Sequence, residues 1–284
     1  MLFLMKHTSY FQGLTSSRDF SLVSGSVECG AVSSVRYLGD NTALTTSEGA
    51  AGVAAWGWGH GGDLLEPRGD IVQCDFQPRG LDTAPGGGAV MVWGDTHVGR
   101  VDTRAGARML DSRHVPGVAG VQSVASSSAG HVTWAVDSRG HVATIDWRVA
   151  DPAAVTKLGD GAETCARVTA DSSDHAAVVT DTGTELRVWD LRDTARPACH
   201  VSHDPVTRDT CPMTVGGGRV VLGLAARVRV YSLRDLGLVF EHRGHRSEVT
   251  GVLCGRGDNS DLSDNLVISC DSKQRLHAWV PSTQ

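Results

Sequence analysis

Histidines are the residues of this chain whose types and spacing first suggest chemistry. The pairs His200-x-x-His203 and His242-x-x-His245 have a spacing that could place two imidazoles on one metal ion. Neither pair has a cysteine or glutamate nearby at a familiar ligand spacing. A nucleophile, a base and an orienting group cannot be assembled from the sequence either. We therefore expect no metal, no cofactor and no catalytic residues.

Several aspartates recur just before a short apolar stretch. An acid in that place usually caps a tight turn by accepting hydrogen bonds from backbone N–H groups. We therefore expect these aspartates to stabilise turns rather than to catalyse. They are Asp95, Asp137, Asp181 and Asp271.

The elements that must position these side chains are marked by an apolar phrase that returns about every 44 residues. The phrase is an apolar residue, two spacers, and then tryptophan or an apolar or aromatic substitute. Its copies are Val53–Trp56, Val98–Val101, Val142–Ile145, Leu186–Trp189, Val228–Tyr231 and Leu276–Trp279. A period of this size with strand-like units is typical of a WD-repeat β-propeller. We predict an all-β propeller that forms a single domain over residues 1–284, with six complete blades in residues 26–284.

Each repeat reads as three strands, and some repeats show a fourth, outer strand. The innermost strands are expected at Val32–Leu38, Ile71–Phe76, Val118–Val124, Cys165–Thr169, Met213–Val215 and Glu248–Cys254. The outer strands are expected at Ala107–Leu110, Val155–Leu158, Ala198–Val201 and Leu238–His242. Glycine clusters at 86–88 and 216–218 indicate hairpin turns. In the last repeat, the internal hydrogen-bond chain typical of WD blades could include His245, Ser269, Asp271 and Trp279.

The last repeat lacks an outer strand, and residues 1–25 offer two ways to complete the fold. Asp19–Val23 could supply that strand and so close the ring without an open sheet edge. Alternatively, Leu2–Met5 is the third strand of a partial upstream blade, and Asp19–Val23 is its outer strand. The second hypothesis gives a seven-bladed pattern whose first blade lacks its inner half.

The composition narrows the classes of partner and compartment. The net charge of −6 argues against a nucleic-acid-binding surface, which usually has a basic face. The seven cysteines contain no C-x-x-C pair, and scattered free thiols suit a reducing compartment. No run of 18 apolar residues is present, so we expect no membrane span. We expect a cytoplasmic protein.

Several segments resemble the WD repeat-containing protein 73 family in the same order along the chain. They are Ser17–Phe20, Val32–Val35, Leu44–Ser47, Gly99–Arg104 and Phe240–His245. The resemblance implies a cytoplasmic scaffold, spindle-associated or partly nuclear. It also implies links to microtubule-associated proteins and to assembly of the Integrator endonuclease module. Members of that family begin further upstream, so Met1 would be a misplaced start or that of a short isoform.

A second resemblance concerns Trp189-Asp190-Leu191-Arg192, which is similar to the WDxR box of substrate receptors for the cullin-4 ubiquitin ligase adaptor. Arg192 would present a charged fork to that partner, or else pair with a nearby carboxylate in a blade turn. Arg104, Arg148 and Arg234 recur at the same phase of their repeats. The alternatives to the first family are therefore a cullin-4 receptor, a methylosome-type WD subunit and, from the histidine and aspartate content alone, a propeller hydrolase.

Overall fold

The structure is a computed structural model of the 284-residue chain. It describes residues 2–7, 20–26, 31–39, 42–58, 65–68, 72–83, 89–103, 108–127, 129–150, 153–159, 165–170, 176–205, 212–254, 266–273 and 275–281. The chain divides into two compact units, Met1–Val121 and Gln122–Gln284, and each is described by itself. The described parts contain no helix, and therefore none that could cross a membrane.

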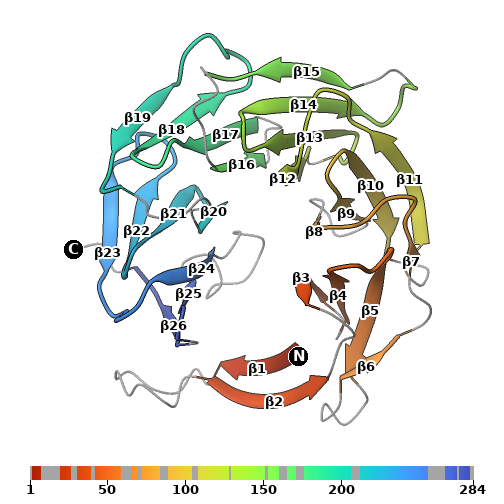
Figure 1. The fold of residues 1–284 in the computed structure, drawn as a ribbon, viewed down its shortest axis with the longest axis horizontal. Helices are drawn as coiled ribbons and strands as arrows, with labels where there is room; N and C mark the ends of the chain where they lie inside the picture. The colour runs from red at the N-terminus through yellow and green to blue at the C-terminus, as the bar shows by residue number, and fades with distance from the viewer. Residues whose placement is uncertain are drawn as a thin grey trace. The chain divides into compact units, whose positions relative to one another are not determined.

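The first unit contains three antiparallel sheets, labelled in chain order in Figure 1. A two-stranded sheet consists of β1 (Leu2–His7) and β2 (Phe20–Ser26). The second sheet consists of β3 (Val32–Gly39), β4 (Thr42–Ser47), β5 (Gly52–Trp58) and β6 (Leu65–Pro67), and β7 (Val72–Gln73) also pairs with β5. The third sheet consists of β8 (Gly80–Thr83), β9 (Ala89–Trp93), β10 (His97–Asp102) and β11 (Arg108–His114).

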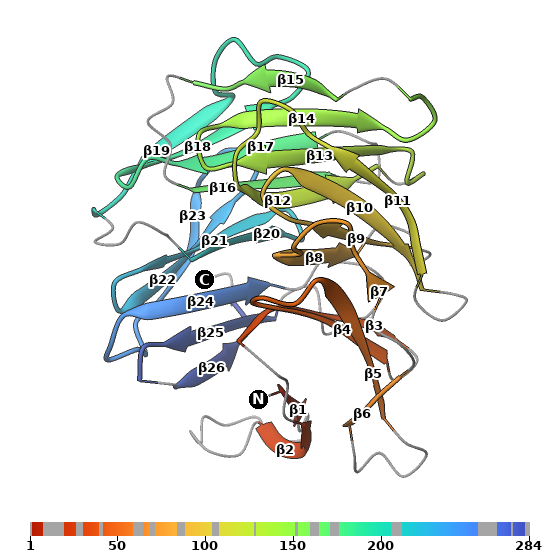
Figure 2. The same cartoon turned by 45° about the vertical axis from the view of Figure 1, so that its right-hand side comes forward.

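The second unit contains four antiparallel sheets that follow one another along the chain (Figure 2). The first two consist of β12 (Val121–Ser126), β13 (Val132–Asp137), β14 (His141–Asp146) and β15 (Ala154–Lys157), then β16 (Cys165–Ala170), β17 (Ala176–Asp181), β18 (Glu185–Asp190) and β19 (Cys199–Ser202). The last two consist of β20 (Met213–Gly216), β21 (Arg219–Leu224), β22 (Arg227–Ser232) and β23 (Leu238–His242), then β24 (Val249–Cys254), β25 (Val267–Asp271) and β26 (Leu276–Trp279).

The six sheets from β3 to β26 are successive blades, here numbered one to six. Blades two to five have four strands in simple up-and-down order, and the described part of blade six has three. This repeated plan confirms the predicted all-β, WD-type β-propeller with six visible blades. The two hypotheses for residues 1–25 stay predictions.

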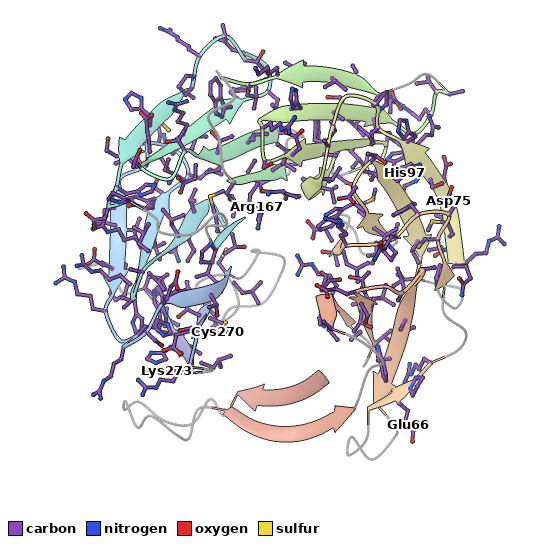
Figure 3. All side chains as sticks on the ribbon, viewed as in Figure 1. Glu66, Asp75, His97, Arg167, Cys270 and Lys273 are labelled. Atoms are coloured by element: carbon purple, nitrogen blue, oxygen red, sulfur yellow. The ribbon has the colours of Figure 1, made fainter. Side chains whose placement is uncertain are left out.

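Within each unit, the apolar cores lie between consecutive blades. Between blades three and four, Val136 and Val142 pack in one cluster with Val168 and Trp189. Similar clusters join blades one and two, four and five, and five and six. Inner strands are also linked directly, since Arg167 Nε in β16 donates to the Met213 carbonyl in β20 at 3.1 Å; Figure 3 labels Arg167.

The expected inner strand at Ile71–Phe76 is wrong. Val72–Gln73 forms β7 and pairs with β5 of blade one, whereas the inner strand of blade two is β8. Leu81 of β8 donates its backbone N–H to Ser34 Oγ in β3 at 3.2 Å. Gly80 is required here, because a Cβ at that position would lie 2.2 Å from the Trp93 indole. The short sequence Gly-Leu-Asp-Thr carries a weak strand signal, whereas the run before it is more apolar and so has the stronger strand pattern.

Replacing Leu81 with alanine tests this assignment. Leu81 is completely buried in the core between blades one and two, so we expect Leu81→Ala to lower the free energy of unfolding by about 2–5 kcal/mol. Leu110→Ala in the outer strand of the same blade is the control, because Leu110 is 48% exposed, and we expect a change of about 0.5 kcal/mol or less. Urea unfolding measures both. Equal losses in the two variants would contradict the placement of β8.

Candidate functional site

The turn after β13 shows what the repeated aspartates do. Asp137 is completely buried, and its Oδ1 accepts hydrogen bonds from the backbone N–H groups of Arg139 and His141, both at 2.9 Å. Its Oδ2 lies 3.0 Å from His141 Nδ1. A buried carboxylate can stay in place here because turn donors replace the water it loses.

Asp271 occupies the corresponding turn between β25 and β26. Its Oδ1 accepts the backbone N–H groups of Lys273 and Arg275, both at 3.0 Å; Figure 3 labels Lys273 in this turn. Burial alone would raise the pKa of the Asp271 carboxyl. Hydrogen bonds from Arg275, Ser247, His245 and Lys273 outweigh burial and lower this pKa to about 2. The carboxylate is therefore ionised at neutral pH and bonded into its own turn.

The other two predicted aspartates differ from each other. Asp181 is completely buried, its Oδ1 accepts the Gly183 N–H, and its Oδ2 lies 3.2 Å from His203 Nε2. Asp95 is exposed, and its Oδ2 pairs with Arg79 Nη2 at 2.8 Å. Three of the four acids are thus bonded inside a blade, and Asp95 forms a surface ion pair.

The hydrogen-bond chain proposed for the last repeat is assembled in blade six. His245 Nε2 lies 2.7 Å from Ser269 Oγ, and His245 Nδ1 lies 3.4 Å from Asp271 Oδ2. Trp279 Nε1 donates to the same Ser269 Oγ at 3.4 Å. The four side chains therefore join the turn before β24 to strands β25 and β26.

The indole-to-hydroxyl bond recurs in three other blades, and sequence reasoning missed it there. The donors and acceptors are Trp56 and Thr45, Trp147 and Thr133, and Trp189 and Thr180, at 2.8–3.0 Å. In each case the hydroxyl lies two residues beyond the residue opposite the tryptophan, because alternate residues share one face of a sheet. In blade three the donor is Trp147, two residues beyond the Ile145 that the repeat phrase marked.

Three of the described cysteines, Cys74, Cys165 and Cys199, have thiols with raised pKa values. Burial, helped by the charge of Asp75, raises the pKa of the Cys74 thiol to about 11. Burial also raises the pKa values of Cys165 and Cys199. These thiols stay protonated at neutral pH and behave as small apolar side chains.

The three residues of the predicted partner motif have separate environments. Trp189 is buried and belongs to the core, whereas the Arg192 side chain is 63% exposed. Arg192 Nε lies 2.9 and 3.0 Å from the two Asp190 carboxylate oxygens, and its Nη2 also bonds that carboxylate. Arg148 forms the same kind of pair with Asp146 at the equivalent turn of blade three. Arg192 therefore pairs with a nearby carboxylate in a blade turn, which is the alternative to presenting a charged fork to a partner.

The described residues include one histidine cluster that could hold a metal ion, consisting of His242, His245 and His277. The sequence pairs the first two, but it gives no sign of the third because strand pairing brings it there. By contrast, His200 and His203 separate, since His200 is exposed and near Glu185 while the His203 side chain is fully buried against Asp181.

Comparison with models of known protein families gives no match, and comparison with curated proteins gives no significant relative. The propeller fold therefore stands on the blades themselves. The resemblance to the WD repeat-containing protein 73 family rests only on the segments that the sequence shows.

The His203–Asp181 contact predicts a dependence of stability on pH. Burial lowers the pKa of His203, but Asp181 and the Asp204 carbonyl raise it more, so the net shift is upward from 6.5. A raised folded-state pKa stabilises the fold below the unfolded value, and this stabilisation is lost as pH rises through the folded value. We therefore expect the wild type to lose stability relative to His203→Gln as pH increases from about 6 to 8.

Thermal unfolding across this pH range measures the effect, and His200→Gln is the matched control. His200 lies three residues earlier with an exposed side chain, so its substitution should leave the wild-type profile unchanged. Superimposable profiles for the wild type and His203→Gln would contradict the assigned role of the buried pair.

Proposed function

We propose that this chain is a non-enzymatic WD-type propeller scaffold for protein–protein interactions. The proposal rests on one observation: three carboxylates that could take part in catalysis form bonds inside the blades instead. The carboxylates of Asp137, Asp181 and Asp271 are buried and bonded to turn backbone or histidine, so they are not presented to a substrate. Exposed turns and strand edges on rigid blades then provide the surface for partners.

The finer proposal is a scaffold of the WD repeat-containing protein 73 kind, in the cytoplasm and associated in part with the spindle or nucleus. It is supported by the ordered segments in the sequence. The most distinctive of them, Phe240–His245, covers the end of β23 and the turn that follows, where Arg243 and Gly244 are exposed. Partners of this scaffold would be Integrator subunits or microtubule-associated proteins.

Quantitative affinity purification with mass spectrometry tests the finer proposal. We expect Integrator endonuclease subunits or tubulin-associated proteins to be enriched at least about tenfold over a tag-only control. A tenfold difference in affinity corresponds to about 1.4 kcal/mol of binding free energy. An Arg243→Glu variant should reduce this enrichment if the turn after β23 contacts the partner, because its side chain is 75% exposed. Recovery of neither class of partner by the wild type would reject this family of function.

A second candidate function is a substrate receptor of the cullin-4 ubiquitin ligase, and it rests on Arg192. The guanidinium is exposed and oriented by Asp190, as a preformed charged fork would be. Arg148 of blade three forms the same exposed pair with Asp146. It lacks the Trp-Asp-Leu sequence that precedes Arg192, since the residues before it are Asp146 and Trp147.

The two arginines provide a matched pair for testing this receptor function. We expect Arg192→Ala to weaken capture of the cullin-4 adaptor by at least about tenfold, as a charged interface residue can. Arg148→Ala should leave capture unchanged, since it removes the same exposed pair at another blade. Pull-down with purified adaptor measures both. Absence of adaptor binding by the wild type, or equal binding by Arg192→Ala, would reject the receptor function.

A further inference from the structure

Three histidines from separate segments meet between blades five and six. His242 ends β23, His245 lies in the turn before β24, and His277 lies in β26. One ring nitrogen of each lies within 4.8 Å of the corresponding nitrogens of the other two. The closest approach joins His242 Nε2 and His277 Nδ1 at 3.0 Å.

The backbone makes room for this approach at Gly244. A Cβ on Gly244 would lie 2.6 Å from His242 Nε2 and 3.0 Å from His277 Nδ1. Any larger residue would therefore push these two nitrogens apart. Trp279 fixes the other side, because its indole stacks on the His242 ring with centroids 4.9 Å apart and an interplanar angle of 11°.

His245 has the kind of outer partner that metal-bound histidines use. Its Nδ1 lies 3.4 Å from the Asp271 carboxylate, which can accept a hydrogen bond from Nδ1–H and leave the lone pair of Nε2 to coordinate a metal. Ser269 Oγ lies 2.7 Å from that Nε2, so its hydroxyl must turn aside or join the ligand set when a cation binds. Asp271 is held by its turn and adds a negative charge beside the site.

Burial disfavours a positive charge on two of the three rings. Burial, with the cost of placing positive charge on His277 and His245 as well, lowers the pKa of His242 to about 4. Burial also lowers the pKa of His277, assisted by His245. Neutral imidazole is the form that coordinates metal ions. His242 and His277 are partly exposed, which leaves a path for an ion to enter.

The separation of the nitrogens also fits a shared cation. A tetrahedral zinc ion with bonds of 2.0–2.1 Å places its ligand nitrogens about 3.3 Å apart. The 3.0 Å between His242 and His277 is close to this value, and the ligand nitrogen of His245 lies within 4.8 Å of both. Without a cation, the contact between His242 Nε2 and His277 Nδ1 is a hydrogen bond in which one nitrogen carries a proton and donates it to the other.

We propose that His242, His245 and His277 form a binding site for one divalent transition-metal ion of the zinc type. Three imidazoles with an outer carboxylate suit Zn²⁺ better than Mg²⁺ or Ca²⁺, which prefer oxygen ligands. The site is independent of the partner-binding function and of its outcome. The ion would join the end of blade five to the third strand of blade six and so stabilise this junction.

The test uses the full chain without a histidine tag, freed of metal by chelation and titrated with Zn²⁺ against a chromophoric chelator. We expect one Zn²⁺ per chain, an increase in the melting temperature on addition of Zn²⁺, and visible absorption bands of tetrahedral Co²⁺ in the substituted protein. His277→Gln and His242→Gln should each weaken Zn²⁺ binding by at least about 100-fold, since each removes a direct ligand and not only its outer partner.

His200→Gln is the matched control, because His200 is an exposed histidine of the same unit away from the cluster, and it should bind Zn²⁺ as the wild type does. Circular dichroism of the metal-free variants checks folding, and Gly244→Ala offers a second variant with all three ligands retained. We expect Gly244→Ala to weaken binding as well. Failure of the folded wild type to bind Zn²⁺ at micromolar concentration, or unchanged binding by both His242→Gln and His277→Gln, would overturn the proposal.

Discussion

The structure depends on one constraint, the burial of apolar sheet faces between consecutive blades. Once a sheet is covered on both sides, each polar group within it must find a partner in its own blade or the next, because water is excluded. The indole of Trp189 on Thr180 and the carboxylate of Asp137 on its turn are two solutions to this requirement. The same requirement holds Asp137, Asp181, Asp271 and His245 inside the blades, away from a surface on which a substrate would bind.

The strand pairing gives this constraint a simple geometric form. A tryptophan near the end of the third strand bonds a hydroxyl on the second strand, two residues beyond its direct partner. Blade five lacks both groups, since Tyr231 and Leu222 stand at those positions, and it is held by a Leu and Val core instead. Arg229 pairs there with Glu241 at 2.7 Å between the third and outer strands. Blade five therefore has the same backbone plan as its neighbours with different internal bonds.

The periodic phrase is sufficient to predict the blades, because the residues that it marks in blades one to five are buried in the cores. It does not predict the inner strand of blade two, β8. Gly80 of β8 fits only because it has no Cβ to meet the Trp93 indole, and Trp93 lies in the partner strand, so this contact exists only in the folded sheet. The phrase also marked Ile145 where Trp147 makes the bond, since a shift of two residues keeps the same face of the strand. His277 could not be found from spacing, because β26 brings it to His242 only after folding.

His245 shows how a structural network and a metal site can occupy the same residue. In its structural role Nε2 faces Ser269 and Nδ1 faces Asp271, so both nitrogens are occupied without a metal. A cation on Nε2 would replace the Ser269 hydroxyl and would leave the contact between Nδ1 and the Asp271 carboxylate in place. Loss of the Ser269 contact is then offset by coordination to His242 and His277, which the network does not otherwise use. The blade can therefore keep its fold in both states, with the cation adding a bond between two blades.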